Sequence, residues 1–329
     1  MEQDYPGGRY LVSKALQLKD VPEESINIAL SSLTTSSYKQ YETCFKKWWQ
    51  FCKEKKTLPF DSSIQSTLLF LTEIYKKGAS HSTLNCYRSA ISLLVGPEMA
   101  QDFRMKRFFK GLANLRPSLP KYNATWDPKI VLDYFTRLGS NDKLTLQELT
   151  SKLITLLALT TGHRMQTFAN VKIDNIEVKD KKAEIKIPDR IKTTGANRKQ
   201  PILVLPVYCK NRKICPVMAL KIYLDRTKSI RNSINNLFIS IKCPYKAVKE
   251  QTLSRWVMKT LKNSGIDISI FSAHSTRHAS TSTAKRRGIS TDAIRKTVGW
   301  TESSRTFAKF YDLNIVENNG VFAKAILNF

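Results

Sequence analysis

A small set of side chains in the second half of the sequence could together carry out phosphoryl transfer. Four of them lie in the stretch 271–312, as an H-x-x-R motif, a Gly-Trp pair and a tyrosine that follows a phenylalanine, and one follows a Thr-Gly pair far upstream. In chain order they are Arg164, His274, Arg277, Trp300 and Tyr311.

Each of these residue types suits one part of that chemistry. A tyrosine hydroxyl can attack a phosphodiester and keep the bond energy in a phosphotyrosine. Two guanidinium groups can stabilise the negative charge of the transition state, because each donates paired hydrogen bonds and stays protonated. An imidazole can transfer a proton near neutral pH, and an indole N–H can donate to the same phosphate. The set therefore suits cleavage and rejoining of a nucleic-acid strand.

The H-x-x-R motif is expected at the start of a helix. Ser272 is a suitable N-cap and Gly288 a suitable residue after the C-terminus, so the pattern predicts a helix over 273–287. His274 and Arg277 would then share one face of its first turn. The motif alone is weak evidence, because a chain this rich in arginine produces it by chance and both residues could be ordinary polar residues of a basic helix.

The complete set is a stronger signal, and it resembles the catalytic residues of the tyrosine recombinases, the integrase family of DNA strand-exchange enzymes. The resemblance implies that Tyr311 is the nucleophile and that Arg164 and Arg277 hold the phosphate with help from Trp300. It implies that His274 handles the tyrosine proton. No metal, nucleotide or other cofactor is implied.

The resemblance also implies a lysine on a β-hairpin that protonates the departing 5′ oxygen. Lys192, in the loop DRIKTTGANRK, takes that position. Ten Lys or Arg residues stand against two acids between residues 181 and 213, so neighbouring basic residues compete for the role, Arg198 and Lys199 above all. A third alternative is a solvated basic loop that touches the DNA backbone.

Two positions depart from the usual family pattern. Thr167 stands three residues after Arg164, where many members have an acidic residue. Tyr311 follows Trp300 by eleven residues, a longer spacing than in bacterial and phage members. The sequence resembles recombinases of eukaryotic mobile elements, of the DIRS-like type, which implies residence in the nucleus, or in the cytoplasm if the protein is prokaryotic.

The composition is that of a folded, strongly basic protein. The 329 residues are 42% hydrophobic and include 54 Lys and Arg against 27 Asp and Glu, a formal charge of +27. A basic excess spread along the whole chain favours a polyanion, most simply double-stranded DNA, as the partner. The six cysteines have no zinc spacing, so we expect reduced thiols in an intracellular protein and no metal. No apolar run is long enough for a membrane span, and no signal peptide is evident.

The first half of the chain predicts helices. After an N-terminal extension, 1–35, apolar stripes at helical spacing predict four helices over 36–116. They resemble the SAM-like core-binding domain with which the family clamps DNA. The aromatic residues of the stripes are expected in the core. The residues chosen as DNA contacts from the two domains are Lys46, Lys47, Arg88, Arg104, Arg107, Arg198 and Lys199.

The second half predicts a mixed domain, so the fold class is mainly α (α+β). A proline-rich linker at 117–127 precedes a catalytic domain at 128–329 that starts with a helix capped by Asp127. Apolar patterns around 173–178, 185–187 and 202–205 predict three strands of a small antiparallel sheet. The apolar tail after Tyr311 suits docking on a neighbouring protomer and equally packing on its own domain.

Two functions remain open from the sequence. The first is an active recombinase or integrase that assembles as a dimer or tetramer on DNA and acts through a 3′-phosphotyrosine. The second is a catalytically inactive, domesticated DNA-binding protein derived from such an enzyme. Relaxation of DNA without strand exchange, as in type IB topoisomerases, is a weaker third possibility because the chemistry is shared.

Overall fold

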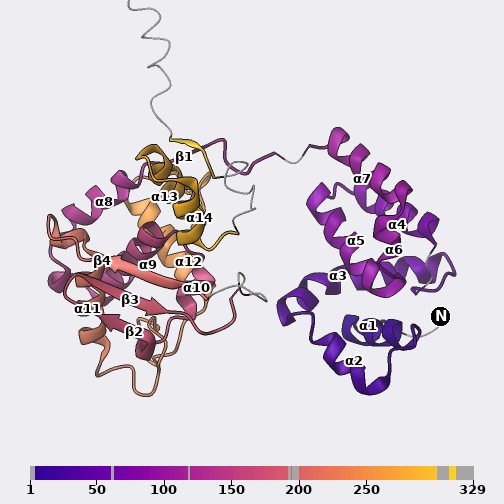
Figure 1. The fold of residues 1–329 in the computed structure, drawn as a ribbon, viewed down its shortest axis with the longest axis horizontal. Coiled ribbons are helices and arrows are strands. Elements are labelled where there is room, and N and C mark those ends of the chain that lie inside the picture. The colour runs from indigo at the N-terminus through magenta and orange to yellow at the C-terminus, as the bar shows by residue number, and fades with distance from the viewer. Residues whose placement is uncertain are drawn as a thin grey trace, which may run out of the picture. The chain divides into compact units, whose positions relative to one another are not determined.

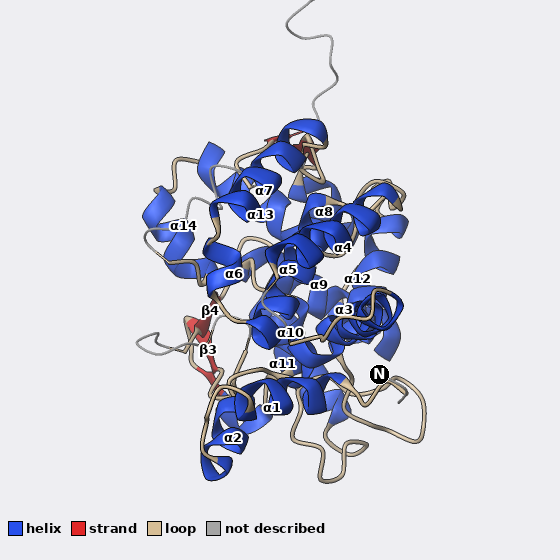
Figure 2. Cartoon of the chain, turned by 90° about the vertical axis from the view of Figure 1, so that its right-hand side faces the viewer, coloured by secondary structure: helices blue, strands red, loops and turns tan. Residues whose placement is uncertain are grey.

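The computed structural model describes residues 4–60, 63–117, 119–191, 194, 200–301 and 311–315. Helices dominate these residues, and the strands among them form two small sheets (Figure 2). The chain divides into two compact units, Met1–Leu119 and Pro120–Phe329, whose elements are labelled in Figure 1. The prediction of a mainly helical fold with a small antiparallel sheet is confirmed.

The first unit contains the four expected helices and three further ones. Three of them begin where a side-chain oxygen, of Thr34, Ser63 or Ser80, accepts a hydrogen bond from a main-chain N–H three residues later. The helices are α1 (Gly8–Gln17), α2 (Glu23–Leu30), α3 (Thr35–Glu54), α4 (Ile64–Lys76), α5 (His81–Val95), α6 (Glu98–Gln101) and α7 (Phe103–Leu115).

Aromatic side chains form the centre of this unit. The ring of Trp48 lies 5.1 Å from that of Phe70, and its indole N–H donates to the carbonyl of Pro59. Trp48 and Phe70 are almost completely buried, as expected for core residues. Leu11 of α1 and Leu30 of α2 are buried in the same cluster, so the described part of the predicted N-terminal extension is a portion of this core.

The second unit begins inside the segment predicted as a linker. Tyr122 and Trp126 are buried in the core of this unit, and β1 (Ala124–Thr125) lies between them. The prediction of a linker over 117–127 is therefore wrong for its second half. Two buried aromatic residues on an extended segment form no periodic pattern, so neither a helix nor a strand could be predicted there.

The described elements of the second unit include the predicted helices and strands, together with short elements that the sequence pattern did not predict. Asp127 caps the first helix through the main-chain N–H of Lys129, as predicted. The elements are α8 (Pro128–Arg137), η1 (Asn141–Lys143), α9 (Leu146–Thr161), α10 (Met165–Ala169), η2 (Ile173–Asn175), β2 (Ile176–Val178), β3 (Lys182–Lys186), β4 (Ile202–Pro206), η3 (Arg212–Ile214), α11 (Pro216–Thr227), α12 (Glu250–Asn263), α13 (Ser275–Arg286), α14 (Thr291–Val298) and β5 (Asn314–Ile315).

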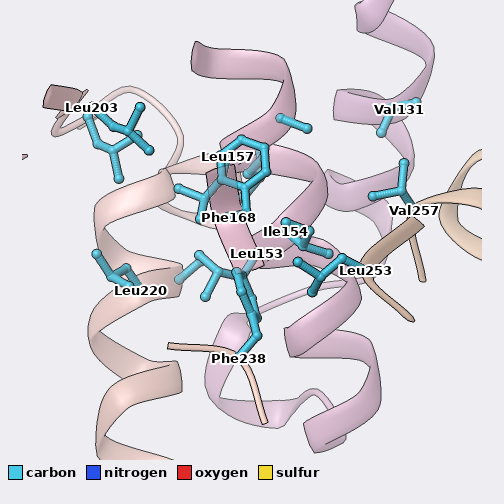
Figure 3. Packing of buried hydrophobic residues seen from close by; sticks show 14 of the residues in the cluster. Val131, Leu153, Ile154, Leu157, Phe168, Leu203, Leu220, Phe238, Leu253 and Val257 are labelled. Carbon is cyan, nitrogen blue, oxygen red and sulfur yellow. The ribbon is translucent and has the colours of Figure 1, made fainter. Parts of the chain in front are cut away.

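Helix α9 is the centre of the second unit. Its side chains are buried all round between residues 149 and 158, and it contacts α11, α12, α13 and β4. A helix that is buried on every side is expected inside a domain. Leu153, Ile154 and Leu157 of α9 meet Leu253 of α12 and Phe168 of α10 in this core (Figure 3). These contacts fix the middle of α9 in the core of the domain.

The three predicted strands form an antiparallel sheet in the order β2-β3-β4. Ile185 of β3 pairs with Ile176 of β2 and with Leu203 of β4. Alternate residues of β3 and β4 are buried, which places one face of the sheet on the core and leaves the other accessible. A second sheet consists of β1 and β5, which pair in parallel although they are almost 200 residues apart in the sequence.

Candidate active site

The site is built where α9 ends. Gly162 terminates this helix in the left-handed conformation, with φ 63°, and a Cβ added there would lie 2.7 Å from the Cγ1 of Val298. A glycine is required at this position for both reasons. Arg164 follows as the residue that precedes α10, with a half-buried side chain.

The H-x-x-R motif opens α13, but not as the sequence predicted. The helix runs over Ser275–Arg286 and His274 is its N-cap residue. Ser272 does not cap it, because its hydroxyl hydrogen-bonds the hydroxyl of Tyr122 at 2.7 Å. Gly288 has φ 82°, as expected for a residue after a helix.

Arg277 is the buried centre of the site, with 1% of its surface exposed. Its guanidinium donates to the carbonyl oxygens of Gly162 at 2.5 Å and Val298 at 3.0 Å, so it joins α9, α13 and α14. Its Cζ lies 4.5 Å from the ring centre of Trp300 and 5.8 Å from that of Tyr311.

Burial and the nearby positive charge of Arg164 lower the pKa of Arg277 to about 9, and Tyr311 opposes this change. The guanidinium therefore remains charged at neutral pH. Within the described parts of the chain, no carboxylate forms an ion pair with either arginine. Two neighbouring cations without a counter-charge form a site suited to an anion.

Tyr311 lies against the start of α13. Its hydroxyl is 2.8 Å from Nε2 of His274, a hydrogen bond, and His274 is exposed while Tyr311 is buried. The imidazole of His278 stacks on the phenol ring, with centroids 4.0 Å apart and planes inclined by 13°. The Trp300 ring lies 4.8 Å away on a third side. The phenol is thus enclosed by three rings, with its hydroxyl hydrogen-bonded to an imidazole nitrogen.

His163 connects the segment carrying Arg164 to the end of α14. Its Nε2 forms a hydrogen bond of 3.0 Å with the carbonyl of Thr297, which requires the proton on that nitrogen. Burial, followed by the charges of Arg277 and Arg164, lowers the pKa of His163 to about 4. His163 is therefore neutral at physiological pH and acts as a structural donor.

Two aromatic residues of the segment that was predicted as a linker hydrogen-bond the residues at the start of α13. The indole N–H of Trp126 donates to the hydroxyl of Ser275 at 2.8 Å, and the main-chain N–H of Ser272 donates to Tyr122. Sequence reasoning missed Tyr122 and Trp126. The only local signal was two large aromatic residues in an otherwise polar, proline-rich stretch.

The structure brings together five of the six residues predicted for catalysis, namely Arg164, His274, Arg277, Trp300 and Tyr311. Lys192 lies outside the described residues, and so do its rivals Arg198 and Lys199. Thr167, which stands in place of an acidic residue, is buried in the first turn of α10, where its main-chain N–H donates to the carbonyl of Arg164.

The five side chains of the first unit that were predicted to contact DNA differ in how accessible they are to a phosphate. Lys46, Lys47 and Arg107 are exposed. Arg88 is half-buried, with its Cζ 4.5 Å from the ring centre of Phe109. Arg104 donates both Nε and Nη2 to the carboxylate of Asp102, so its planar fork is already occupied.

The described residues contain neither a candidate metal site nor a candidate membrane-spanning helix. No group of three His, Cys, Asp or Glu side chains there is arranged to hold a metal ion. None of the helices described is both long and apolar enough to cross a membrane.

Known proteins identify the family. The model of the phage integrase family matches residues 134–315. No curated protein sequence is detectably similar to the chain. Among solved structures, the Tn1549 transposon integrase in complex with transposon right end DNA has a TM-score of 0.62 at 13% identity, over 98% of both chains.

Two further solved structures have the same fold. The XerH recombinase in its post-cleavage complex with palindromic difH substrate has a TM-score of 0.60 at 15% identity, over 99% of this chain and 96% of that chain. A lambda integrase dimer bound to a COC′ core site has a TM-score of 0.53 at 15% identity, over 92% and 76%. The family match spans more than half of the sequence, and the chain therefore belongs to the phage integrase family and has the fold of the tyrosine recombinases.

Proposed function

We propose that the protein is a site-specific recombinase or integrase that cuts and rejoins DNA through a 3′-phosphotyrosine at Tyr311. The phenol oxygen attacks the scissile phosphorus, a P–O bond to tyrosine forms, and the bond to the 5′ oxygen breaks. His274 accepts the phenol proton. Attack by a 5′ hydroxyl of a second strand reverses these steps and releases the tyrosine.

One observation carries this proposal: a tyrosine hydroxyl, hydrogen-bonded to an imidazole, lies beside a buried arginine that pairs with no carboxylate among the described residues. A phosphate would supply the missing negative charge. Arg277 uses two of its five N–H donors on main-chain carbonyls, which leaves donors for phosphate oxygens. Arg164 and Trp300 supply further donors from neighbouring elements.

Lys192 is the proposed acid for the 5′ oxygen. A lysine can take this role when its pKa approaches neutrality. The support is its place in the basic loop between β3 and β4, and the assignment rests on the sequence because the residue lies outside the described part of the chain. Arg198 and Lys199 remain the alternatives.

DNA is the proposed partner. The charge of +27 favours a polyanion, and the exposed Lys46, Lys47 and Arg107 of the first unit suit phosphate contacts. Structures of similar fold contain DNA: a XerH pre-cleavage complex with difH, and a lambda integrase tetramer bound to a Holliday junction. By analogy, we infer that this chain assembles as a dimer or tetramer on its site.

An origin in a mobile element follows from the same analogy, since one neighbour is a transposon integrase. The DIRS-like subtype and residence in the nucleus remain predictions from the style of the sequence. Microscopy of the tagged protein in its host cell tests the second of these.

The test is covalent capture on a nicked suicide duplex, in which the cleaved fragment diffuses away and leaves a protein–DNA adduct. The wild-type protein should form the adduct, Tyr311→Phe should form none, and Arg164→Ala should form it roughly 10²- to 10³-fold more slowly. Tyr134→Phe, a half-buried tyrosine of α8 outside the site, is the matched control and should behave as wild type.

Adduct formation by Tyr311→Phe at the wild-type rate would refute the assignment of the nucleophile. DNA binding by the wild-type protein without any adduct, on several candidate sites, would favour the alternative of a catalytically inactive DNA-binding protein.

A further inference from the structure

The N-cap residue of α13 and two residues on the same face of the helix contact three different parts of Tyr311. His274, His278 and Ser282 follow one another at intervals of four residues, so they form a stripe along the helix. His274 bonds the hydroxyl at 2.8 Å, His278 stacks on the ring at 4.0 Å, and Ser282 donates to the main-chain carbonyl of Tyr311 at 2.6 Å. The helix therefore binds this residue from its reactive atom to its backbone.

The hydroxyl of Ser282 holds the backbone on both sides of Asp312. It donates to the carbonyl of Tyr311 and accepts from the main-chain N–H of Leu313 at 3.1 Å. One hydroxyl can do both, because it has one hydrogen and two lone pairs. Ser282 is 1% exposed, so water does not compete for these bonds. Thr281 reaches the same carbonyl only at 3.5 Å and is committed at 2.8 Å to its own helix.

The backbone beyond Leu313 is held by a different element. Asn314 and Ile315 of β5 pair with Ala124 and Thr125 of β1, and α13 contacts both strands (Figure 1). A ladder of two residues supplies few hydrogen bonds. Among the described residues, the serine therefore contributes an attachment at Tyr311 itself and another at Leu313, the residue before the ladder begins.

We propose that Ser282, together with His278, positions Tyr311 for attack on the phosphate, a role that rests on the proposed function. Ser282 fixes the main chain and His278 fixes the ring plane, so the phenol oxygen is held at His274 before substrate arrives. Neither residue touches the reacting atoms. A displacement of about 1 Å at a nucleophile can slow a reaction roughly 100-fold, which makes such anchoring consequential.

The decisive comparison is Ser282→Ala with Ser280→Ala. Ser280 lies on the same helix, but its hydroxyl returns to the carbonyl of Thr276 in that helix. In single-turnover capture with saturating protein, we expect Ser282→Ala to form the adduct about 10- to 100-fold more slowly, while its affinity for DNA stays within about twofold of wild type. Ser280→Ala should change neither quantity.

A substrate with a 5′-bridging sulfur separates this role from that of the proposed general acid. Sulfur leaves without protonation, so it should restore the rate of Lys192→Ala and leave the deficit of Ser282→Ala in place. Ser282→Cys, which keeps the shape and a weaker donor, should have an intermediate rate and serves if the alanine variant does not fold.

Hydrogen exchange gives a measurement that needs no activity. The amide of Leu313 should exchange faster in Ser282→Ala than in wild type or Ser280→Ala, because its acceptor is gone. Equal capture rates for the two variants would overturn the positioning role, and unchanged Leu313 exchange would overturn the anchor itself. If wild-type protein forms no adduct, the proposed function fails, and exchange alone decides whether Ser282 anchors this segment.

Discussion

Protonation of His163 should destabilise the second unit at mildly acidic pH. The imidazole is neutral in the fold, with a pKa of about 4, whereas the same side chain has a pKa of 6.5 in an unfolded chain. Between these values the unfolded state binds more protons than the folded state. The stabilisation is therefore complete above pH 6.5 and is lost as the pH falls towards 4.

The magnitude follows from the gap between the two pKa values. Linkage gives a loss of about 2 kcal/mol at pH 5 and about 3 kcal/mol at pH 4 from this residue alone. A loss of this size is a large fraction of the stability of an ordinary domain. The loss of stability would arise at the hydrogen bond between His163 and Thr297, which joins the segment of Arg164 to the end of α14.

The assay is equilibrium urea unfolding of the full chain from pH 7 to pH 4, for wild type and His163→Gln. Glutamine can still donate to the carbonyl of Thr297 but takes up no proton. The free energy of unfolding of wild type should fall by about 3 kcal/mol more than that of the variant over this range. His81→Gln, at a half-buried histidine of the first unit, should follow wild type. Parallel curves for wild type and His163→Gln would refute the reasoning.

Three further predictions test other parts of the molecule. Gly162→Ala should lower the free energy of unfolding by about 1–2 kcal/mol from its left-handed backbone alone, and a double-mutant cycle with Val298→Ala, whose side chain is buried, should isolate the further cost of the 2.7 Å contact in denaturant titrations. Arg107→Ala should reduce the number of counterions released on DNA binding by about one. Arg104→Ala should reduce it less, because the guanidinium of Arg104 is already paired with Asp102. Binding titrations at several salt concentrations measure this number for each variant. His278→Phe, which keeps a ring against the phenol, should retain more adduct formation than His278→Ala, and equal rates would exclude a role for stacking.

The helices of both units could be predicted because their signals are local. The apolar stripe containing Phe45, Trp48 and Cys52 marks α3, and Asp127 followed by a proline marks the start of α8. The alternation in β3 and β4 likewise depends only on neighbouring residues. Where a pattern was interrupted by a tertiary contact the prediction failed, as at Ser272, whose hydroxyl bonds Tyr122 instead of capping α13.

The candidate site could be predicted only as a set of residue types. The motifs named His274, Arg277, Trp300 and Tyr311, since chemistry constrains which side chains can hold a phosphate and attack it. Their spacing did not predict that Arg277 would be buried on two main-chain carbonyls, nor that the phenol would be enclosed by three rings.

The sequence by itself determined which chemistry the chain can carry and which segments form helices and strands. The tertiary structure alone decided how Tyr311 is held. Ser282 binds its backbone, β1 pairs with the strand that follows it, and Trp126 secures the start of α13 from 149 residues away. The physical reason is that propensity and periodicity report interactions between near neighbours in sequence. Hydrogen bonds between segments so far apart in the chain exist only after the core around α9 has brought those segments together.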